Sequence, residues 1–259
     1  SAHCWACGWT IASAEHKALM GWEDIYEYDD EECMTKEIIT VEEIDRIKSY
    51  TGIVGQSFRG ITDATYGAYA CRFKYSEETG EVVESFYPYT QGYEAAGFKV
   101  RKIPKDFYSV GKIGKDSELF GQWKWKDTRS KYVLLTAGEI DALSAYQMLE
   151  NYRQGKGSDF DPTPVVSSAI GETGSYKQVQ LQYNWLNQFQ KIIVCYDNDD
   201  AGKAAVKSLV SVLPKGKMFV MQLSLKDINE YLVQGKEKLF LRAFFDAPAY
   251  SPDGIVGSG

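Results

Sequence analysis

Apolar and polar residues follow two different patterns along the chain. One pattern occurs in the N-terminal half and the other in the C-terminal half. Apolar positions alternate with polar ones over residues 69–75 and again over 82–89, with a turn sequence at 78–81 between them. A period of two is typical of half-buried strands, so this region predicts a β-hairpin. Residues 98–102 alternate in the same way and are a candidate third strand.

In the second pattern, which begins near residue 130, short apolar runs alternate with segments of helical periodicity. The expected strands are 132–136, 163–167, 191–196 and 217–223, and the expected helices are 140–152, 177–188, 201–213 and 228–234. Such alternation predicts parallel βαβ units, whose ligands bind at the carboxyl ends of the strands. The chain as a whole is therefore expected to be α/β (α+β overall). A Rossmann-like parallel sheet with helices on both faces would follow a smaller mixed α/β subdomain with an antiparallel hairpin.

The stretch before the hairpin is acidic, and we interpret residues 15–47 as a solvated connector. Thr40 stands three residues before Glu43, which is the spacing of a capping box and predicts a short helix over 42–50. At the other end, residues 246–259 contain prolines and a Gly/Ser terminus and are expected to begin another linker.

Composition limits the class of protein. The 259 residues carry a net charge of −7, which argues against a surface that binds nucleic acid everywhere but leaves room for a local basic groove. The sequence contains no run of about 18 apolar residues, so it predicts no membrane span, and its first residues do not resemble a signal peptide. Five cysteines with one close pair make no disulfide framework, so we expect a reducing compartment.

Acidic residues follow three of the expected strands. Asp141 comes after the first, Asp197 and Asp199 after the third, and Asp227 after the fourth. Because the carboxyl ends of parallel strands meet at one edge of a sheet, these side chains are expected to converge on one crevice. Converging carboxylates repel one another unless a cation lies between them, and Mg²⁺ prefers such oxygen ligands. Each acid alone is equally well explained as a helix N-cap, whereas three together are poorly explained by capping.

Basic residues gather near the third hairpin strand. Lys99 and Arg101 would share one face of that strand, and Lys105 follows in a loop. This pattern has two interpretations: an edge strand kept soluble by its cations, or a strip that contacts phosphates. The strand alone favours the first.

Two cysteines near the start, Cys4 and Cys7, have the spacing of one side of a zinc ribbon. One pair supplies two of the four ligands that structural zinc needs. We interpret the pair as half of a ribbon whose other pair lies upstream; the alternative is two unrelated cysteines.

The ordered motifs resemble a known family. A strand followed by glycine-acid-x-acid, then Asp-x-Asp after a later strand, is the Toprim pattern of primases and topoisomerases. Residues 53–256 more closely resemble the primase half of bifunctional bacteriophage primase–helicases of the T-odd type, to which mitochondrial Twinkle is related. The matching stretches are Arg59-Gly60-Ile61, Lys99-Val100-Arg101, Leu119-Phe120-Gly121, Gly138-Glu139-Ile140-Asp141, Phe189-x-Lys191-Ile192-Ile193, Asp197-x-Asp199-x-Ala201-Gly202, Leu213-Pro214-x-Gly216-Lys217, Lys226-Asp227-x-Asn229-Glu230 and Pro252-Asp253-Gly254.

This resemblance implies a domain order and a set of partners. The implied parts are a zinc-binding remnant at 1–14, an acidic linker at 15–47, an N-terminal primase subdomain at 48–125, a Toprim subdomain at 126–245 and the start of a linker to a helicase at 246–259. The implied partners are a single-stranded DNA template, ribonucleoside triphosphates, the helicase domain of the same polypeptide and the replicative DNA polymerase, with no membrane. The expected location is the cytoplasm of the infected bacterial host.

The resemblance also implies roles at the site. Asp197 and Asp199 would be the firmest ligands for Mg²⁺ or Mn²⁺, supported by Asp227 and Asp141. The cations Lys99, Arg101 and Lys105 would hold triphosphate or template phosphates. Zn²⁺ would be bound in the full-length protein, through Cys4, Cys7 and an upstream pair, and would help to read the template.

One position departs from the family pattern. Ala137 stands where the family has a glutamate, the proposed general base, and alanine neither accepts a proton nor binds a metal. Glu139 is expected to point away from the crevice, whereas Asp141 lies one helical turn after Ala137 on the same face. We therefore expect a DNA primase, a nucleotidyltransferase, in an inactivated form that makes little or no primer. An engineered substitution is favoured over a natural degeneration.

Other functions share the same residues. A Toprim hydrolase or nuclease would use the same carboxylates, although the basic strip matches a polymerising domain better. A template-binding module that has lost catalysis would also explain Ala137. The least specific reading is a doubly wound α/β protein with acidic helix caps.

Overall fold

The computed structural model describes residues 2–4, 9–11, 39–157, 160–197 and 199–251, and divides the chain into two compact units. The first unit covers Ser1–Glu37. Its described part is a two-stranded antiparallel ribbon, β1 (Ala2–Cys4) with β2 (Trp9–Ile11). Cys7 and the side chain of Cys4 lie outside the description, so the zinc interpretation stays a prediction.

The second unit, Ile38–Gly259, contains an antiparallel sheet with strand order β3-β4-β5-β6. The strands are β3 (Arg72–Tyr75), β4 (Val82–Gln91), β5 (Glu94–Lys102) and β6 (Asp106–Gly111). The predicted hairpin is present as β3 and β4, and the third strand follows it. The edge-strand interpretation of residues 98–102 is wrong, because β6 pairs with β5 along its outer side.

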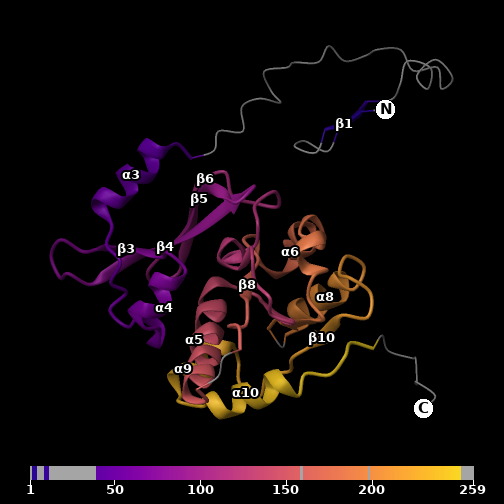
Figure 1. Cartoon of the computed structure of the whole chain (residues 1–259). Coiled ribbons are helices and arrows are strands. Elements are labelled where there is room, and N and C mark those ends of the chain that lie inside the picture. Colours follow the sequence, from indigo (N-terminus) through magenta and orange to yellow (C-terminus); the bar gives the residue numbers. More distant parts are fainter. Residues whose placement is uncertain (1, 5–8, 12–38, 158–159, 198, 252–259) are drawn as a thin grey trace, which may run out of the picture. The chain divides into compact units, whose positions relative to one another are not determined.

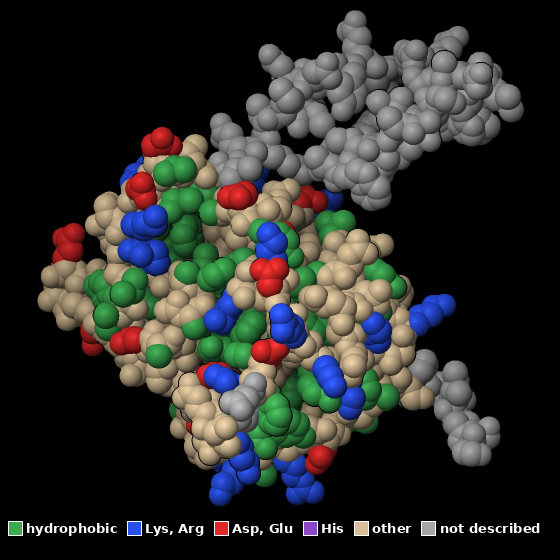
Figure 2. Space-filling model, in the orientation of Figure 1, with side chains coloured by type: hydrophobic (Ala, Val, Ile, Leu, Met, Phe, Trp, Pro, Cys, Tyr) green, Lys and Arg blue, Asp and Glu red, His purple; other side chains and the backbone are tan. Residues whose placement is uncertain are grey.

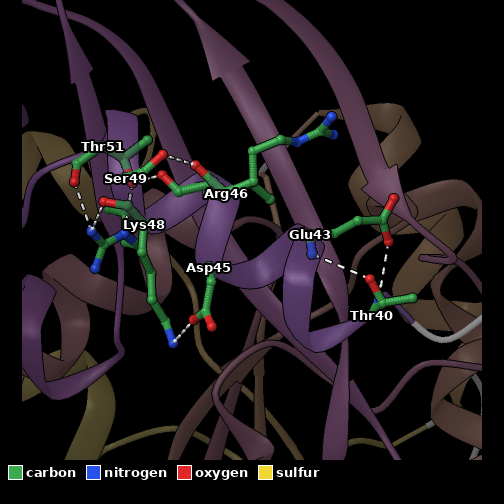
Figure 3. A network of polar contacts seen from close by, with 9 residues as sticks. Thr40, Glu43, Asp45, Arg46, Lys48, Ser49 and Thr51 are labelled. Carbon is green, nitrogen blue, oxygen red and sulfur yellow. Dashed lines mark hydrogen bonds and ion pairs between the residues drawn. The ribbon is translucent and has the colours of Figure 1, made fainter.

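Helix α3 (Val41–Tyr50) shows how the sequence before the sheet folds onto it (Figure 3). The predicted capping box is confirmed: the Thr40 hydroxyl accepts from the Glu43 amide, and the Glu43 carboxylate accepts from the Thr40 amide. Ile47 on this helix is buried. Together with Ile39 it forms a small apolar cluster with three residues of the sheet, Phe86, Phe98 and Val100. This cluster covers one face of the antiparallel sheet.

Two short helical segments connect α3 to β3: the 3₁₀ turn η1 (Phe58–Gly60) and α4 (Asp63–Ala68). A further 3₁₀ turn, η2 (Gln122–Trp125), connects the two sheets. Arg59 in η1 has a φ of 59°, an uncommon backbone conformation for a residue other than glycine. Hydrogen bonds from the C-terminal half hold this turn, as described below.

The second sheet is parallel throughout, with strand order β10-β9-β7-β8. Its strands are β7 (Tyr132–Thr136), β8 (Val165–Ser167), β9 (Lys191–Cys195) and β10 (Met218–Val220). All four strands were expected from the apolar runs, because strands covered on both faces read as continuous apolar stretches. In the segment expected to start a linker, the Pro248 carbonyl accepts from the Val220 amide and the Tyr250 amide donates to the Met218 carbonyl, so both residues bind to β10.

Helices cover both faces of the parallel sheet, as predicted (Figure 1). The helices are α5 (Glu139–Gly155), α6 (Gly171–Leu181), α7 (Tyr183–Leu186), α8 (Asp200–Leu209), α9 (Ile228–Val233) and α10 (Glu237–Phe245). Helix α6 packs against α8, whereas α5 packs against α9 and α10. The expected helix over 177–188 is two helices displaced toward the N-terminus, and α10 was not predicted.

One apolar core joins the two sheets. The ring of Phe120 lies 5.3 Å from that of Tyr69 and 5.8 Å from that of Tyr89, and the Phe120 backbone pairs with Ser167 of the parallel sheet. The Tyr69 hydroxyl donates to the carbonyl of Val165, 2.8 Å away. Because all these groups are buried, the antiparallel sheet is fixed relative to the carboxyl edge of the parallel sheet. Within the described residues, no helix has the length and hydropathy needed to cross a membrane.

Candidate active site

Three carboxylates from separate segments come together at the carboxyl edge of the parallel sheet. Asp141 lies in the first turn of α5, Asp197 directly follows β9, and Asp227 is the N-cap of α9. Burial, and after it the negative charges of Asp227 and Asp197, together raise the pKa of Asp141 to about 7. These acids therefore lie close enough for the charges of Asp227 and Asp197 to act on Asp141, while a shared ion stays a prediction.

Asp199 joins this cluster from the start of α8. Its carboxylate accepts a hydrogen bond from the Gly202 amide at 2.8 Å and so caps the helix. Burial is the first cause of the raised pKa of Asp197, and the charge of Asp199 is the second. One Asp199 oxygen thus serves a structural purpose, while the carboxylate stays near Asp197. Capping and ion binding are compatible at this position.

Gly202 is needed because α8 starts very close to the end of β9. A Cβ atom at Gly202 would collide with the backbone carbonyl oxygen of Asp197. Only glycine leaves room for this approach. The glycine in the Asp-x-Asp-x-Ala-Gly sequence therefore places the helix N-terminus against the strand end that carries the two acids.

Hydrogen bonds hold α9 against α5 beneath the acids. The backbone N–H of Asn229 donates to the Asp141 carboxylate at 3.2 Å. The Asn229 side chain donates to Ser144 Oγ at 2.9 Å and to the carbonyl of Arg59 at 2.8 Å. Asp227 accepts from the Glu230 amide at 2.9 Å. Asn229 is buried and links both helices to η1, so this residue fixes the spacing of Asp141 and Asp227.

The chemistry of these donors fits a hard divalent cation. Carboxylates supply the oxygen ligands that such a cation prefers. A cation between them would also relieve their mutual repulsion, which contributes to the raised pKa values. In the described part of the chain, no three His, Cys, Asp or Glu side chains are grouped closely enough to cage one ion. Mg²⁺ commonly takes one or two protein carboxylates and completes its shell with water and substrate phosphates. The arrangement fits that open type of site.

A cavity of about 190 Å³ has Asp141 in its wall, and we name it the basic cavity after its two cations, Lys99 and Arg101, although Glu139 also lines it. The antiparallel sheet and the start of α5 line it together, with Tyr87, Lys99, Arg101, Phe107, Gly138, Glu139, Ile140 and Asp141. The ring of Phe107 lies 5.5 Å from the Lys99 amine and 5.6 Å from the Arg101 guanidinium carbon. Among the described residues, the buried Nε of Arg101 has no hydrogen-bond partner. Two of the three predicted cations, Lys99 and Arg101, therefore face one cavity.

The expectation that Glu139 points away from the crevice is wrong. Its side chain lines the cavity and forms an ion pair with Lys99, with 2.8 Å between Nζ and Oε1. The Tyr89 hydroxyl donates to the same oxygen at 2.6 Å. The prediction considered only the direction of the helix, whereas the antiparallel sheet packs over the start of α5 and gives Glu139 two partners.

Cations from two loops lie near the acids. Lys226 and Lys105 both lower the pKa of Asp197, opposing the rise that burial and the other acids cause. Lys105 was predicted as a site residue, whereas Lys226 was not, although it directly precedes Asp227 in a matched motif. Figure 2 shows that basic and acidic side chains lie near one another across the middle of the face in view. Ala137 lies between β7 and α5, is partly buried and packs against the core.

Comparisons with known proteins agree with this geometry. The model of the family described as Toprim-like matches residues 134–232. Those residues contain β7, β9 and the acids at their ends. This part of the chain is therefore similar to Toprim-like domains.

Phage proteins resemble more of the chain than this domain. The chain is similar to the DNA helicase/primase of Enterobacteria phage T3. The two sequences are 35% identical over 161 residues, which cover 62% of this chain and 26% of the relative. The chain thus spans about a quarter of that relative. The crystal structure of the primase fragment of the bacteriophage T7 primase-helicase matches with a TM-score of 0.65 and 27% identity, over 75% of each chain.

Two further solved structures share the architecture. The first is the structure of the bacteriophage T7 lagging-strand DNA polymerase interacting with primase domains that are bound to an RNA/DNA hybrid and dTTP. It matches with a TM-score of 0.66 and 27% identity, over 77% of this chain and 94% of the matched chain. The primase of Aquifex aeolicus, comprising zinc-binding and RNA polymerase domains, matches with a TM-score of 0.53 at 18% identity, over 82% of this chain and 57% of that one. The Aquifex likeness concerns the fold alone.

Proposed function

We propose that this chain is the primer-synthesising part of a DNA primase, which makes RNA primers on single-stranded DNA during phage replication. One observation carries the proposal: Asp141, one of the clustered acids, lies in the wall of the cavity that Lys99 and Arg101 of the antiparallel sheet also line. Nucleotidyl transfer needs both, since a metal site and a phosphate-binding site must meet at the reacting atoms. The phage relatives support this choice.

The reaction joins two nucleotides. The 3′-hydroxyl oxygen of one attacks the α-phosphorus of a second nucleoside triphosphate, a new P–O bond forms, the α–β bridging P–O bond breaks, and pyrophosphate leaves. Asp197 and Asp199 would hold Mg²⁺ or Mn²⁺, with Asp227 and Asp141 in support. Such an ion supplies charge stabilisation at the phosphoryl oxygens.

The basic residues would bind the triphosphate. Lys99 and Arg101 present cationic N–H groups to the cavity, and charge-assisted hydrogen bonds to phosphate are stronger than neutral ones. Lys105 lies close enough to influence Asp197 and would contact phosphates of the template or the leaving group. These groups orient substrate against the acids.

Ala137 would limit the chemistry. It occupies the position that we assign to a general base, and alanine offers no group to accept the proton of the attacking hydroxyl. We propose that the chain binds metal, nucleotide and template but makes little or no primer. The longer protein would include a complete Zn²⁺ ribbon that contains Cys4 and Cys7, and a helicase domain. It would work with the replicative DNA polymerase in the infected bacterial cytoplasm.

Restoring the acid tests this proposal. Ala137→Glu and the control Ala137→Gln would be compared for synthesis of labelled oligoribonucleotides on circular single-stranded DNA, with a zinc ribbon supplied and Mg²⁺ or Mn²⁺ present. General acid–base catalysis contributes roughly 10²–10⁴-fold, so a gain of that order is expected for the glutamate alone. Equal activity of all three proteins would contradict the role of position 137.

Two alternatives give different results in the same assay. A hydrolase or nuclease would shorten an end-labelled template instead of forming primer, and the phage relatives do not favour it. A template-binding module without catalysis would retain single-strand affinity, yet Ala137→Glu would add no metal-dependent synthesis.

A further inference from the structure

A buried ion pair connects the two sheets at the wall of the basic cavity. Lys99 on β5 and Glu139 at the start of α5 are separated by 2.8 Å, and their side chains are only 18% and 6% exposed. Surface ion pairs contribute little, because water screens them, but burial makes the geometry of a pair matter more. This pair therefore restricts where the Lys99 amine can lie.

The carboxylate is itself held in place. Tyr89, which is buried, donates its hydroxyl to the same Glu139 oxygen that binds Lys99. Burial of Tyr89 itself, and after it the negative charge of Glu139, raise the pKa of the Tyr89 hydroxyl well above its usual value, so this group stays a donor. Tyr89 lies on β4 and Glu139 begins α5, so the contact joins the antiparallel sheet to the Toprim domain.

The restraint acts on a group that faces the cavity. An unrestrained lysine must lose the freedom of four side-chain torsions when it binds a phosphate, and this loss opposes binding. A lysine held by one hydrogen bond keeps two N–H groups for a ligand and has already lost most of that freedom. The Arg101 guanidinium beside it has a buried Nε without a partner in the described residues, which marks the same wall as a site for an anion.

We infer that Glu139 is a positioning residue, which holds the Lys99 amine where a nucleotide triphosphate enters the cavity. This inference rests on the proposed function, because it takes the cavity to bind nucleotide. Glu139 neither touches the reacting atoms nor replaces the acid missing at position 137. Its effect reaches the substrate only through Lys99.

A double-mutant cycle tests the inference on the chain as it is. The affinity for Mg²⁺-ATP would be measured by titration calorimetry for Lys99→Met, Glu139→Gln and the double variant. We expect Lys99→Met to weaken binding about tenfold or more, in line with a lost charge-assisted hydrogen bond. Glu139→Gln should weaken it roughly threefold to tenfold alone, and should change nothing further when Lys99 is already methionine.

A matched control separates positioning from general destabilisation. Glu150 lies on the same helix and binds Arg153 at 2.6 Å, with a side chain 17% exposed, but it is not part of the cavity wall. Glu150→Gln should leave ATP affinity unchanged. Tyr89→Phe keeps the ring and removes the hydrogen bond to Glu139, so it should weaken binding in the same direction by less. This variant keeps the test valid if Glu139→Gln does not fold.

The outcomes are distinct. Weaker binding of Glu139→Gln that disappears in the Lys99→Met background supports positioning. Equal loss in both backgrounds would show a general structural effect, and tighter binding would show that Glu139 merely neutralises Lys99; either result overturns the inference while the nucleotide site stands. If the unmodified chain does not bind Mg²⁺-ATP at all, the proposed function and this inference both fail.

Discussion

The acidic and basic parts of the candidate site are assembled in different ways. Lys99 and Arg101 lie two residues apart on one strand, so local alternation puts both into one cavity. The acids instead come from three segments, at the starts of α5 and α9 and after β9, and only the parallel sheet unites them. The placement of the two cations thus depends on the register of one strand, whereas the acidic cluster depends on the whole parallel sheet and its helices.

Removing one acid should have the largest effect on the acidic part. Asp197→Asn is expected to weaken the affinity for Mn²⁺ by at least about tenfold, as measured by electron paramagnetic resonance. Changes to groups that only orient metal ligands already lower metal affinity by roughly 10–100-fold. Asp200→Asn alters another exposed carboxylate of the same segment, one that is not among the predicted metal ligands, and serves as the control. Equal weakening by both substitutions would mean that the segment attracts cations only through its overall charge.

Crowding the backbone behind that acid should come next. Gly202→Ala introduces a methyl group against the Asp197 carbonyl, so α8 must move away from β9. We expect a loss of about 1–3 kcal/mol in the free energy of unfolding, measured with urea, together with weaker Mn²⁺ binding. The control Gly67→Ala meets no atoms within 4 Å in α4 and should not destabilise the protein. Equal stability of both variants would contradict the close approach.

Burial of Asp141, together with repulsion from the neighbouring acids, should make stability depend on pH. The folded pKa of Asp141, about 7, lies above its usual value of 3.8, so the folded state binds this proton more tightly than the unfolded state. Stability without divalent ions should therefore fall as the pH rises from about 4 to about 7. Asp141→Asn should flatten this fall in thermal melts with EDTA. An unchanged slope would show that Asp141 is not the group responsible.

The smallest expected effect concerns the support of the basic part. Thr40→Ala removes the cap of α3, whose Ile47 packs beneath the strands that carry the cations. The free energy of unfolding should fall by about 1 kcal/mol, and Thr40→Ser should retain most of it. Mn²⁺ affinity should be unaffected, because the acids lie on the other sheet. A change in metal binding would instead couple the two parts.

Much of this protein could be predicted from its residues alone. Apolar runs gave the four parallel strands, because strands buried on both faces need continuous apolar sequence, and Thr40 with Glu43 gave the start of α3. The positions of Asp141, Asp197 and Asp227 after those strands predicted their convergence, since parallel strands end at one edge.

Only the tertiary structure decided how the two sheets meet. Strand β6 turned residues 98–102 from a supposed edge into an inner strand, and the pairing of Glu139 with Lys99 and Tyr89 reversed the direction predicted for that side chain. No local period contains such facts, because they depend on which surface packs over a helix N-terminus. The sequence determined the strands and the acids at their ends, while packing through the shared core around Phe120 set the basic cavity beside them.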